Sequence, residues 1–240
     1  SLLHAIVENF SWAYPAALPP DALGQLVAIG HRLFAQFDDT PEVKAFWWPR
    51  FLLTADHFIR WEERRRSGLA RIAVECSTGA SFPLPDGAEL RLSGKADRIE
   101  VTRDGRLRII DFKTGSPPSK KQVEKGFAPQ LTLEAELAAR AGFRDVVGPM
   151  PVEAVHYLKL HHDPKGWTKD TELKFKDRHL ADVAAEHLER LLLHVAALRD
   201  GREAYLSRRA PDYIKYSSPY DRLARVKEWA AAGGEAEDEA

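Results

Sequence analysis

Apolar residues recur every three to four positions over much of the chain, which is the spacing of amphipathic helices. This pattern predicts helices over residues 2–13, 20–37, 40–66, 129–141, 178–199 and 220–231. The third begins at Thr40-Pro41, a suitable cap and first turn, and is rich in aromatic residues. Because several of these aromatics recur at helical spacing, we expect them to pack in the core rather than stack on nucleobases.

Strict alternation of apolar and polar residues, typical of strands with one buried face, occupies other parts of the chain. It predicts strands over residues 69–76 and 152–160, with a short strand over 80–84. Residues 161–177 predict a loop or a short hairpin. Together these elements predict an α/β (α+β) fold, in which helices flank a central mixed sheet and residues 1–67 add a helical amino-terminal part.

The strongest local signal is a β-hairpin over residues 94–113, because two alternating runs flank the turn sequence Thr-Arg-Asp-Gly at 102–105. A two-residue turn would place Asp97 and Asp111 on opposite faces of this hairpin. A three-residue loop that ends at a left-handed Gly105 would instead put Asp97 directly across from Asp111. The turn geometry therefore decides whether the two carboxylates meet.

In the second register, one face of the hairpin is apolar at its buried end and charged at its open end. The apolar residues of this face are Ile99, Val101, Leu107 and Ile109. Opposed side chains have Cβ atoms roughly 4.5–5.5 Å apart, so Asp97 and Asp111 both stay ionised only if a cation lies between them. Lys113 points the same way, because the strand period is two. The open end is therefore a candidate metal site.

The composition, with 44% hydrophobic and 30% charged residues among 240, is that of an ordinary globular protein. We expect one domain over residues 1–231 and a disordered acidic tail over 232–240. Within the domain we expect a helical part (1–67), a catalytic sheet and helix (68–160) and a carboxy-terminal part (161–231).

No apolar run approaches the roughly 20 residues of a membrane span, and no signal peptide opens the chain, which predicts a cytoplasmic protein. The abrupt start suggests a domain excised from a longer polypeptide.

The net charge of −1 does not by itself indicate nucleic-acid binding. The distribution of charge is more informative, because Lys120, Lys121 and Lys125 cluster in the sequence beside the candidate site and would contact a DNA backbone. Cys76 is the only cysteine, which excludes an intrachain disulfide and a cysteine-ligated iron-sulfur cluster within the chain.

An aspartate on one strand and Asp-x-Lys on the next resemble the pattern of the PD-(D/E)xK nucleases. The run Ile109–Gly115, followed by Gly126–Leu131, is similar to the RecB-type nuclease domain. Further segments resemble the carboxy-terminal nuclease domain of the AddB family, in its alphaproteobacterial branch. These segments are Phe46–Phe51, Ala128–Leu131 with Leu133–Ala135, and Tyr220-Asp221 with Leu223–Val226. The resemblance covers most of residues 1–230.

This resemblance implies a restriction-endonuclease-like core and a deoxyribonuclease that depends on Mg2+ or Mn2+. It further implies a task in double-strand-break repair beside an AddA-type helicase-nuclease subunit. The metal ligands it implies are Asp97, Asp111 and the backbone carbonyl of Phe112. His4 lies in a segment that resembles the first RecB-family motif, where a helix-borne histidine contributes to the metal site. A histidine on an apolar helix is otherwise more often a core or surface residue, and the sequence leaves both open.

The resemblance also implies that Lys113 places the attacking water or stabilises phosphate oxygens, and that Gln130 positions Lys113 or the substrate. RecB-type enzymes typically have Gln-x-x-x-Tyr, and this chain departs from them with Glu134 in place of the tyrosine. We expect Glu134 to support the site indirectly. Glu75, at the end of the first predicted strand, is either a surface residue or a further carboxylate near the site.

Three alternatives remain open at this point. The charged hairpin residues could form surface salt bridges of modest worth. The domain could be a non-cutting module that binds DNA or a helicase, or a stand-alone restriction-type endonuclease, although no target-recognition element is identifiable. The adjacent His161 and His162 do not converge on one ion from a regular strand, so we expect them at the surface.

Overall fold

The computed structural model describes residues 1–160 and 169–204, and these belong to two compact units that divide at Leu193/His194. Its helical elements are α1 (Leu2–Ala13), α2 (Ala22–Phe34), the 3-10 turn η1 (Ala35–Phe37), α3 (Pro41–Arg66), α4 (Lys120–Glu124), α5 (Gln130–Ala141) and α6 (Leu180–Arg199). The strands are β1 (Leu69–Pro83), β2 (Glu89–Thr102), β3 (Leu107–Lys113), β4 (Val152–Lys159) and β5 (Lys169–Glu172). The strands all lie in the first unit.

Some of the sequence-based predictions fall on residues that are not described. His161 and His162, the helix expected over 220–231 and the tail expected over 232–240 all lie outside the described residues. The single domain over residues 1–231 stays a prediction. No helix within the described ranges combines the length and the apolarity that crossing a membrane requires.

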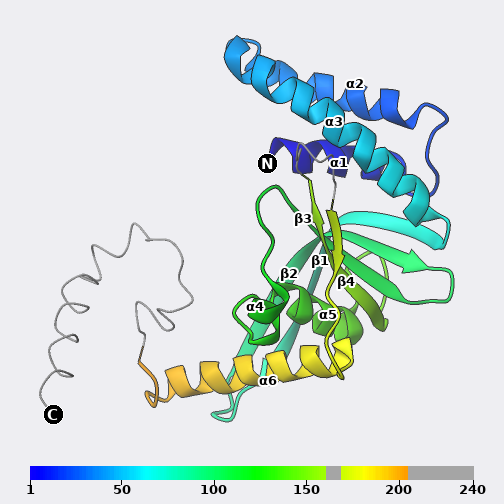
Figure 1. Ribbon diagram of the computed structural model, residues 1–240. Coiled ribbons are helices and arrows are strands. Elements are labelled where there is room, and N and C mark those ends of the chain that lie inside the picture. Colours follow the sequence, from blue (N-terminus) through cyan, green and yellow to red (C-terminus); the bar gives the residue numbers. More distant parts are fainter. Residues whose placement is uncertain (161–168, 205–240) are drawn as a thin grey trace, which may run out of the picture. The chain divides into compact units, whose positions relative to one another are not determined.

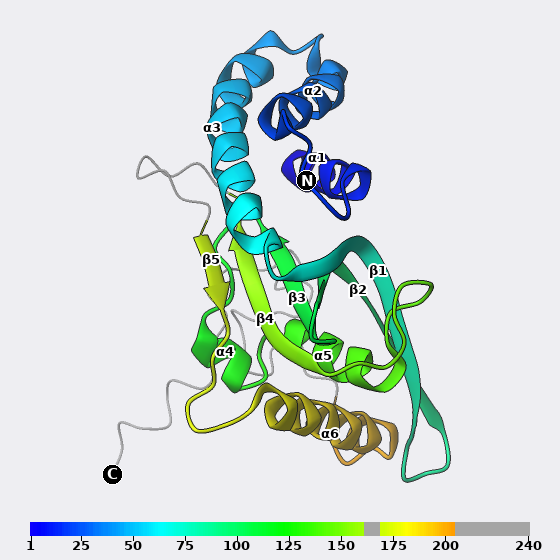
Figure 2. The same cartoon turned by 90° about the vertical axis from the view of Figure 1, so that its right-hand side faces the viewer.

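The strands form one sheet in the order β1-β2-β3-β4-β5. Strand β3 is parallel to β4, and the other neighbouring pairs are antiparallel. Figure 1 shows α1, α2 and α3 on one side of this sheet and α5 on the other, and Figure 2 shows the same separation after a quarter turn. The predicted fold class, a mixed sheet flanked by helices with an amino-terminal helical part, is confirmed.

The hairpin between β2 and β3 has the second of the two registers considered. Ile99 pairs with Ile109, and the Thr102 N–H donates to the carbonyl of Arg106 at 2.9 Å. Gly105 has a φ of 78°, the left-handed conformation that closes the three-residue loop. The turn chemistry thus fixes which residues share a face with the candidate carboxylates.

One detail of the predicted strands is wrong, and one short helix was missed. Residues 69–76 and 80–84 were expected as separate strands, but β1 runs without a break because Gly79, which has no side chain, still pairs through its backbone with Ser93. The short helix α4 was not expected; a capping box at Ser119 and Gln122 starts it. The strand β5 forms part of the region expected as a loop or hairpin.

The two faces of the sheet carry separate hydrophobic clusters, since side chains alternate along each strand. Ile110 and Phe112 of β3 pack with α1, α2 and α3. Ile109 packs on the opposite face with Leu131 and Ala135 of α5. Asp111 shares the parity of Ile109, so it faces α5.

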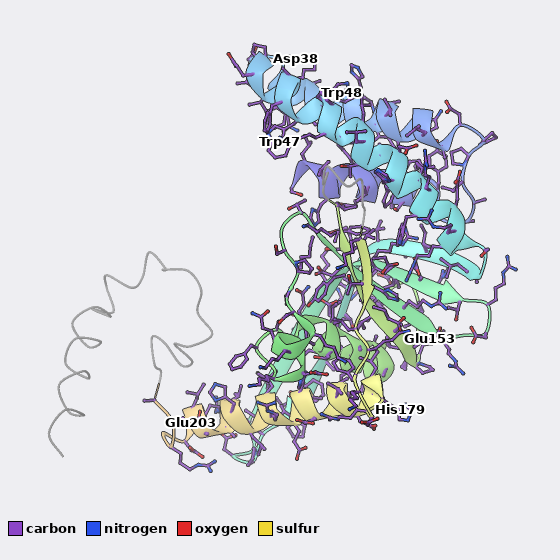
Figure 3. All side chains as sticks on the ribbon, viewed as in Figure 1. Asp38, Trp47, Trp48, Glu153, His179 and Glu203 are labelled. Carbon is purple, nitrogen blue, oxygen red and sulfur yellow. The ribbon has the colours of Figure 1, made fainter. Side chains whose placement is uncertain are left out.

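The aromatic residues of α3 divide between core and surface. Phe51, Phe58 and Trp61 are buried, as expected, and Trp48 packs against the same cluster. Trp47 is 48% exposed, so the expectation of core packing is wrong for this residue. Figure 3 shows Trp47 and Trp48 on the half of α3 that lies away from the sheet, where there is less of the domain to cover them.

A buried ion-pair network joins α3 to β2. The Arg98 guanidinium is fully buried between the carboxylates of Glu62 and Glu100. Arg65 also contacts Glu100, at 2.8 Å. Because Arg98 follows Asp97 in the strand, the network holds β2 from the face opposite the candidate site.

Candidate active site

Four side chains expected in the site converge where β2, β3 and α5 meet. Asp97 comes from β2, Asp111 and Lys113 from β3, and Gln130 from the first position of α5. The Phe112 N–H donates to Asp97 Oδ2 at 2.7 Å. Gln130 Nε2 donates to Asp111 Oδ1 at 2.9 Å, and Lys113 Nζ lies 2.6 Å from Asp111 Oδ2. Asp97 and Gln130 are 33 positions apart in the sequence. Both nevertheless form hydrogen bonds to residues of β3.

The two aspartates differ in their surroundings. The paired positions of β2 and β3 end at Arg98 and Ile110, next to Asp97 and Asp111. The carboxylate of Asp97 accepts a hydrogen bond from the backbone of β3, at Phe112. Burial raises the pKa of Asp97, and the nearby charge of Asp111 raises it further, against the lowering effect of the Phe112 N–H. Asp111 is only 3% exposed. A cation between the two carboxylates would offset both the burial and the repulsion.

His4 of α1 reaches the same strand. Its Nε2 lies 2.6 Å from the carbonyl oxygen of Phe112, and its Nδ1 lies 2.5 Å from Ser1 Oγ. A carbonyl only accepts, so Nε2 carries the proton and donates, while Nδ1 accepts from the serine hydroxyl. Two of the expected metal ligands are therefore bonded to each other, and this hydrogen bond would have to give way before both could hold a metal.

The donor groups of the site suit a divalent cation that keeps several waters. Among residues 1–160 and 169–204, no three His, Cys, Asp or Glu side chains are arranged as a ready-made metal group. Mg2+ is usually held by only one or two carboxylates and keeps several waters. Asp111 Oδ2 is buried and accepts no well-aligned hydrogen bond, despite its close contact with Lys113. The carboxylates of Asp97 and Asp111, together with the buried Asp111 Oδ2 that lacks a well-aligned hydrogen bond, therefore fit a hard cation.

Glu134 lies one helical turn after Gln130 and touches it. Gln130 Nε2 donates to Glu134 Oε1 at 3.1 Å, while Glu134 Oε2 is buried without a hydrogen-bond partner. Burial raises the pKa of Glu134 to about 7, and the charges of Asp111 and Asp97 act in the same direction. The hydrogen bond from Gln130 lowers it only in part. The site therefore holds a third carboxyl group that is near its pKa at neutral pH.

Glu75 lies on β1 beside Asp97 and has a φ of 55°, which is strained for a residue other than glycine. Its carboxylate forms an ion pair with Lys95. The charge of Glu75 adds to the rise in the pKa of Asp97, after the larger effects of burial and Asp111. Glu75 is thus near the aspartates, although any role in a reaction stays a prediction.

Sequence reasoning missed two residues near the site. Burial raises the pKa of Glu8, and the charges of Glu75 and Asp97 add to the rise. Glu8 is four residues after His4 on α1, so helical spacing could have found it. Tyr157 pairs with Asp111 across the parallel strands, and Lys113 Nζ lies 5.8 Å from its ring centroid. No local sequence pattern predicts that Tyr157 pairs with Asp111.

The three lysines expected to bind DNA are exposed near the start of α5. Lys120 and Lys121 belong to α4, and Lys125 follows it directly. Lys120 Nζ lies 3.5 Å from Glu124 Oε1, an exposed ion pair that neutralises part of its charge. Their contact with DNA stays a prediction.

A mixed sheet flanked by helices, with two aspartates and a lysine on adjacent strands, is the arrangement of the PD-(D/E)XK fold. Residues 1–211 match the family model described as the PD-(D/E)XK nuclease superfamily. The chain belongs to this superfamily.

The individual relatives match only part of this chain, at less than 30% identity. The chain is 28% identical over 143 residues to an uncharacterized protein of Rickettsia bellii, a match that covers 60% of this chain and 17% of that protein. It is 29% identical over 157 residues to a subunit of the ATP-dependent helicase/deoxyribonuclease of Geobacillus kaustophilus, a match that covers 59% of this chain and 13% of that relative. The chain thus spans about a sixth or less of these relatives. The second match supports distant homology to AddB.

Among solved structures, the crystal structure of SSO0001 is 13% identical and covers 80% of this chain and 73% of that one. Its TM-score of 0.33 is too low to support an argument about function.

Proposed function

We propose that the chain is the nuclease domain of an AddB-type subunit and that it hydrolyses phosphodiester bonds of DNA with the aid of Mg2+ or Mn2+. In this proposal it processes double-strand-break ends together with an AddA-type helicase-nuclease partner. The observation that carries the proposal is the convergence of Asp97, Asp111, Lys113 and Gln130 at one end of the sheet. The superfamily membership and the match to a helicase/deoxyribonuclease from Geobacillus kaustophilus support it.

The carboxylates of Asp97 and Asp111 would hold the metal, with the Phe112 carbonyl and His4 as further ligands. When bound, a divalent cation supplies positive charge that stabilises the growing charge of the scissile phosphate and makes a water molecule more acidic. The chain's own groups do the positioning. Lys113, anchored against Asp111, would donate to a phosphate oxygen or orient the attacking water.

Gln130 complements this arrangement from α5. Its amide nitrogen is bound to Asp111, so its carbonyl end is available to accept a hydrogen bond from the substrate, from the attacking water or from Lys113. Lys120, Lys121 and Lys125 would hold the flanking DNA backbone by charge, which positions the strand without reading its sequence.

The experiment that tests this function compares cleavage of linear single-stranded DNA by the chain and by Asp111→Ala, with Mg2+ or Mn2+. We expect the variant to lose cleavage while it keeps its fold and its affinity for DNA. Glu153→Ala is the matched control, because this exposed carboxylate pairs with Arg108 near the amino-terminal end of β4, away from the site. Figure 3 labels Glu153.

The outcomes separate the remaining alternatives. Cutting retained by Asp111→Ala would remove the metal assignment. An inactive wild-type chain that still binds metal by calorimetry would need its larger complex to deliver DNA. An inactive chain that binds DNA but no metal would be the non-cutting module.

A further inference from the structure

Glu134 is the residue at which this chain departs from the Gln-x-x-x-Tyr pattern, and its contacts are specific. Its side chain is 4% exposed, and its Oε1 accepts a hydrogen bond from Gln130 Nε2 at 3.1 Å. The same nitrogen donates to Asp111 Oδ1 at 2.9 Å. The amide of Gln130 therefore bridges two carboxyl groups, one from its own helix and one from β3.

This bridge fixes the orientation of the Gln130 amide. A primary amide nitrogen has two hydrogens, and here each is used by a different carboxyl oxygen. The carboxylate of Asp111 only accepts, so turning the amide around would place the carbonyl oxygen of Gln130 against Asp111 Oδ1. A tyrosine hydroxyl both donates and accepts, and would be compatible with either orientation.

The packing around Glu134 leaves its side chain little freedom. Gly94 of β2 lies directly beside it, and a Cβ at Gly94 would come within 3.4 Å of Glu134 Cγ. Glu134 Oε2 is buried without a partner, which costs free energy. An apolar side chain at this position would avoid that cost, so packing alone gives no reason for a carboxyl group here.

We infer that Glu134 is a positioning residue: it holds Gln130 so that Gln130 in turn holds Asp111 Oδ1. This keeps Asp111 Oδ2, the oxygen beside Lys113, free of Gln130 and able to face a cation. This inference rests on the proposed nuclease function. It goes beyond that function because it gives a task to the residue that replaces the tyrosine. Glu134 touches neither the substrate nor the metal in this arrangement, and acts only through Gln130.

The test measures cleavage rates of single-stranded DNA at saturating DNA and Mg2+. Glu134→Ala should be about tenfold slower, the usual effect of losing one hydrogen bond that involves a charged group. Glu134→Gln keeps a carbonyl oxygen that accepts from Gln130, so its rate should stay within about threefold of wild type. The double variant Glu134→Ala/Gln130→Ala should be no slower than Gln130→Ala, because one residue acts through the other.

Controls exclude a general loss of structure. Glu136→Ala removes another largely buried carboxylate from α5, one that pairs with Arg140 at 2.6 Å, and should keep the wild-type rate. Far-UV circular dichroism should be the same for every variant. DNA affinity measured without metal should also be unchanged in Glu134→Ala, since the expected loss is in turnover.

Several results would overturn the inference. If the effects of Glu134→Ala and Gln130→Ala multiply in the double variant, the two residues act independently. If Glu134→Gln is as slow as Glu134→Ala, an accepting oxygen is not what the site needs. If the wild-type chain neither cleaves DNA nor binds a divalent cation, the proposed function fails first and the inference falls with it; the wild-type rate and calorimetry with Mg2+ together identify that case.

Discussion

The pKa of Glu134 makes a quantitative prediction about stability. Burial raises it from its ordinary value of 4.5 to about 7 in the folded chain. Each pKa unit corresponds to about 1.4 kcal/mol. Folding therefore favours the protonated form of Glu134 over the ionised form by about 3 kcal/mol. The folded state binds this proton more tightly than the unfolded state. The stabilisation is therefore complete below pH 4.5 and is lost as the pH rises through about 7.

The perturbation is Glu134→Gln, which removes the titrating group and keeps the size of the side chain. The free energy of unfolding of the variant minus that of the wild type should increase by about 3 kcal/mol from pH 4 to pH 8. The amide introduced at position 134 also leaves a buried N–H group, and the cost of burying it is the same at every pH. The test therefore uses only the change with pH of the difference between the two free energies of unfolding.

The assay is urea unfolding followed by tryptophan fluorescence, in EDTA and at several pH values. Acidic groups that do not interact with Glu134 titrate alike in both proteins and cancel in the difference. Glu136→Gln on the same helix controls for the exchange of a carboxylate for an amide. Two stability curves that stay parallel from pH 4 to pH 8 would refute the assignment of a raised pKa to Glu134.

Three further perturbations have defined outcomes. Glu62→Ala should lower the free energy of unfolding by about 3–5 kcal/mol, because it removes one of the two carboxylates that pair with the fully buried Arg98; a loss below about 1 kcal/mol in urea unfolding would contradict this. The double variant Lys120→Ala/Lys121→Ala should weaken DNA binding and flatten its dependence on salt, whereas Lys174→Ala/Lys176→Ala, near the other end of the sheet, should leave the slope unchanged. Equal slopes for both variants would remove the first pair from the DNA path. Removing divalent metal with EDTA should stop cleavage and leave the circular dichroism unchanged, and persistent cleavage would exclude a metal-dependent reaction.

The local parts of the fold could be predicted from the sequence because the interactions that form them are short in sequence. The sequence limits the hairpin to two registers, and the left-handed Gly105 selects the one in which Asp97 and Asp111 share a face. The helices α1, α3 and α5 follow from apolar spacing. The error at β1 arose where Gly79 interrupts the alternation but not the backbone pairing.

Other features depend on which surfaces pack together, and the sequence gives no local sign of them. Arg98 is buried only because α3 brings Glu62, 36 positions earlier, onto that face of β2. Tyr157 lies beside Asp111 only because β4 runs parallel to β3.

The sequence by itself determined the superfamily pattern and the hairpin that carries the two aspartates, since turn sequence and side-chain periodicity are local properties. The tertiary structure alone decided that Gln130 bridges Asp111 and Glu134, and that Glu134 is buried deeply enough for its pKa to rise. Packing α5 against the sheet removes water from these carboxyl groups, and the resulting cost of charge depends on every neighbour that the fold assembles around them.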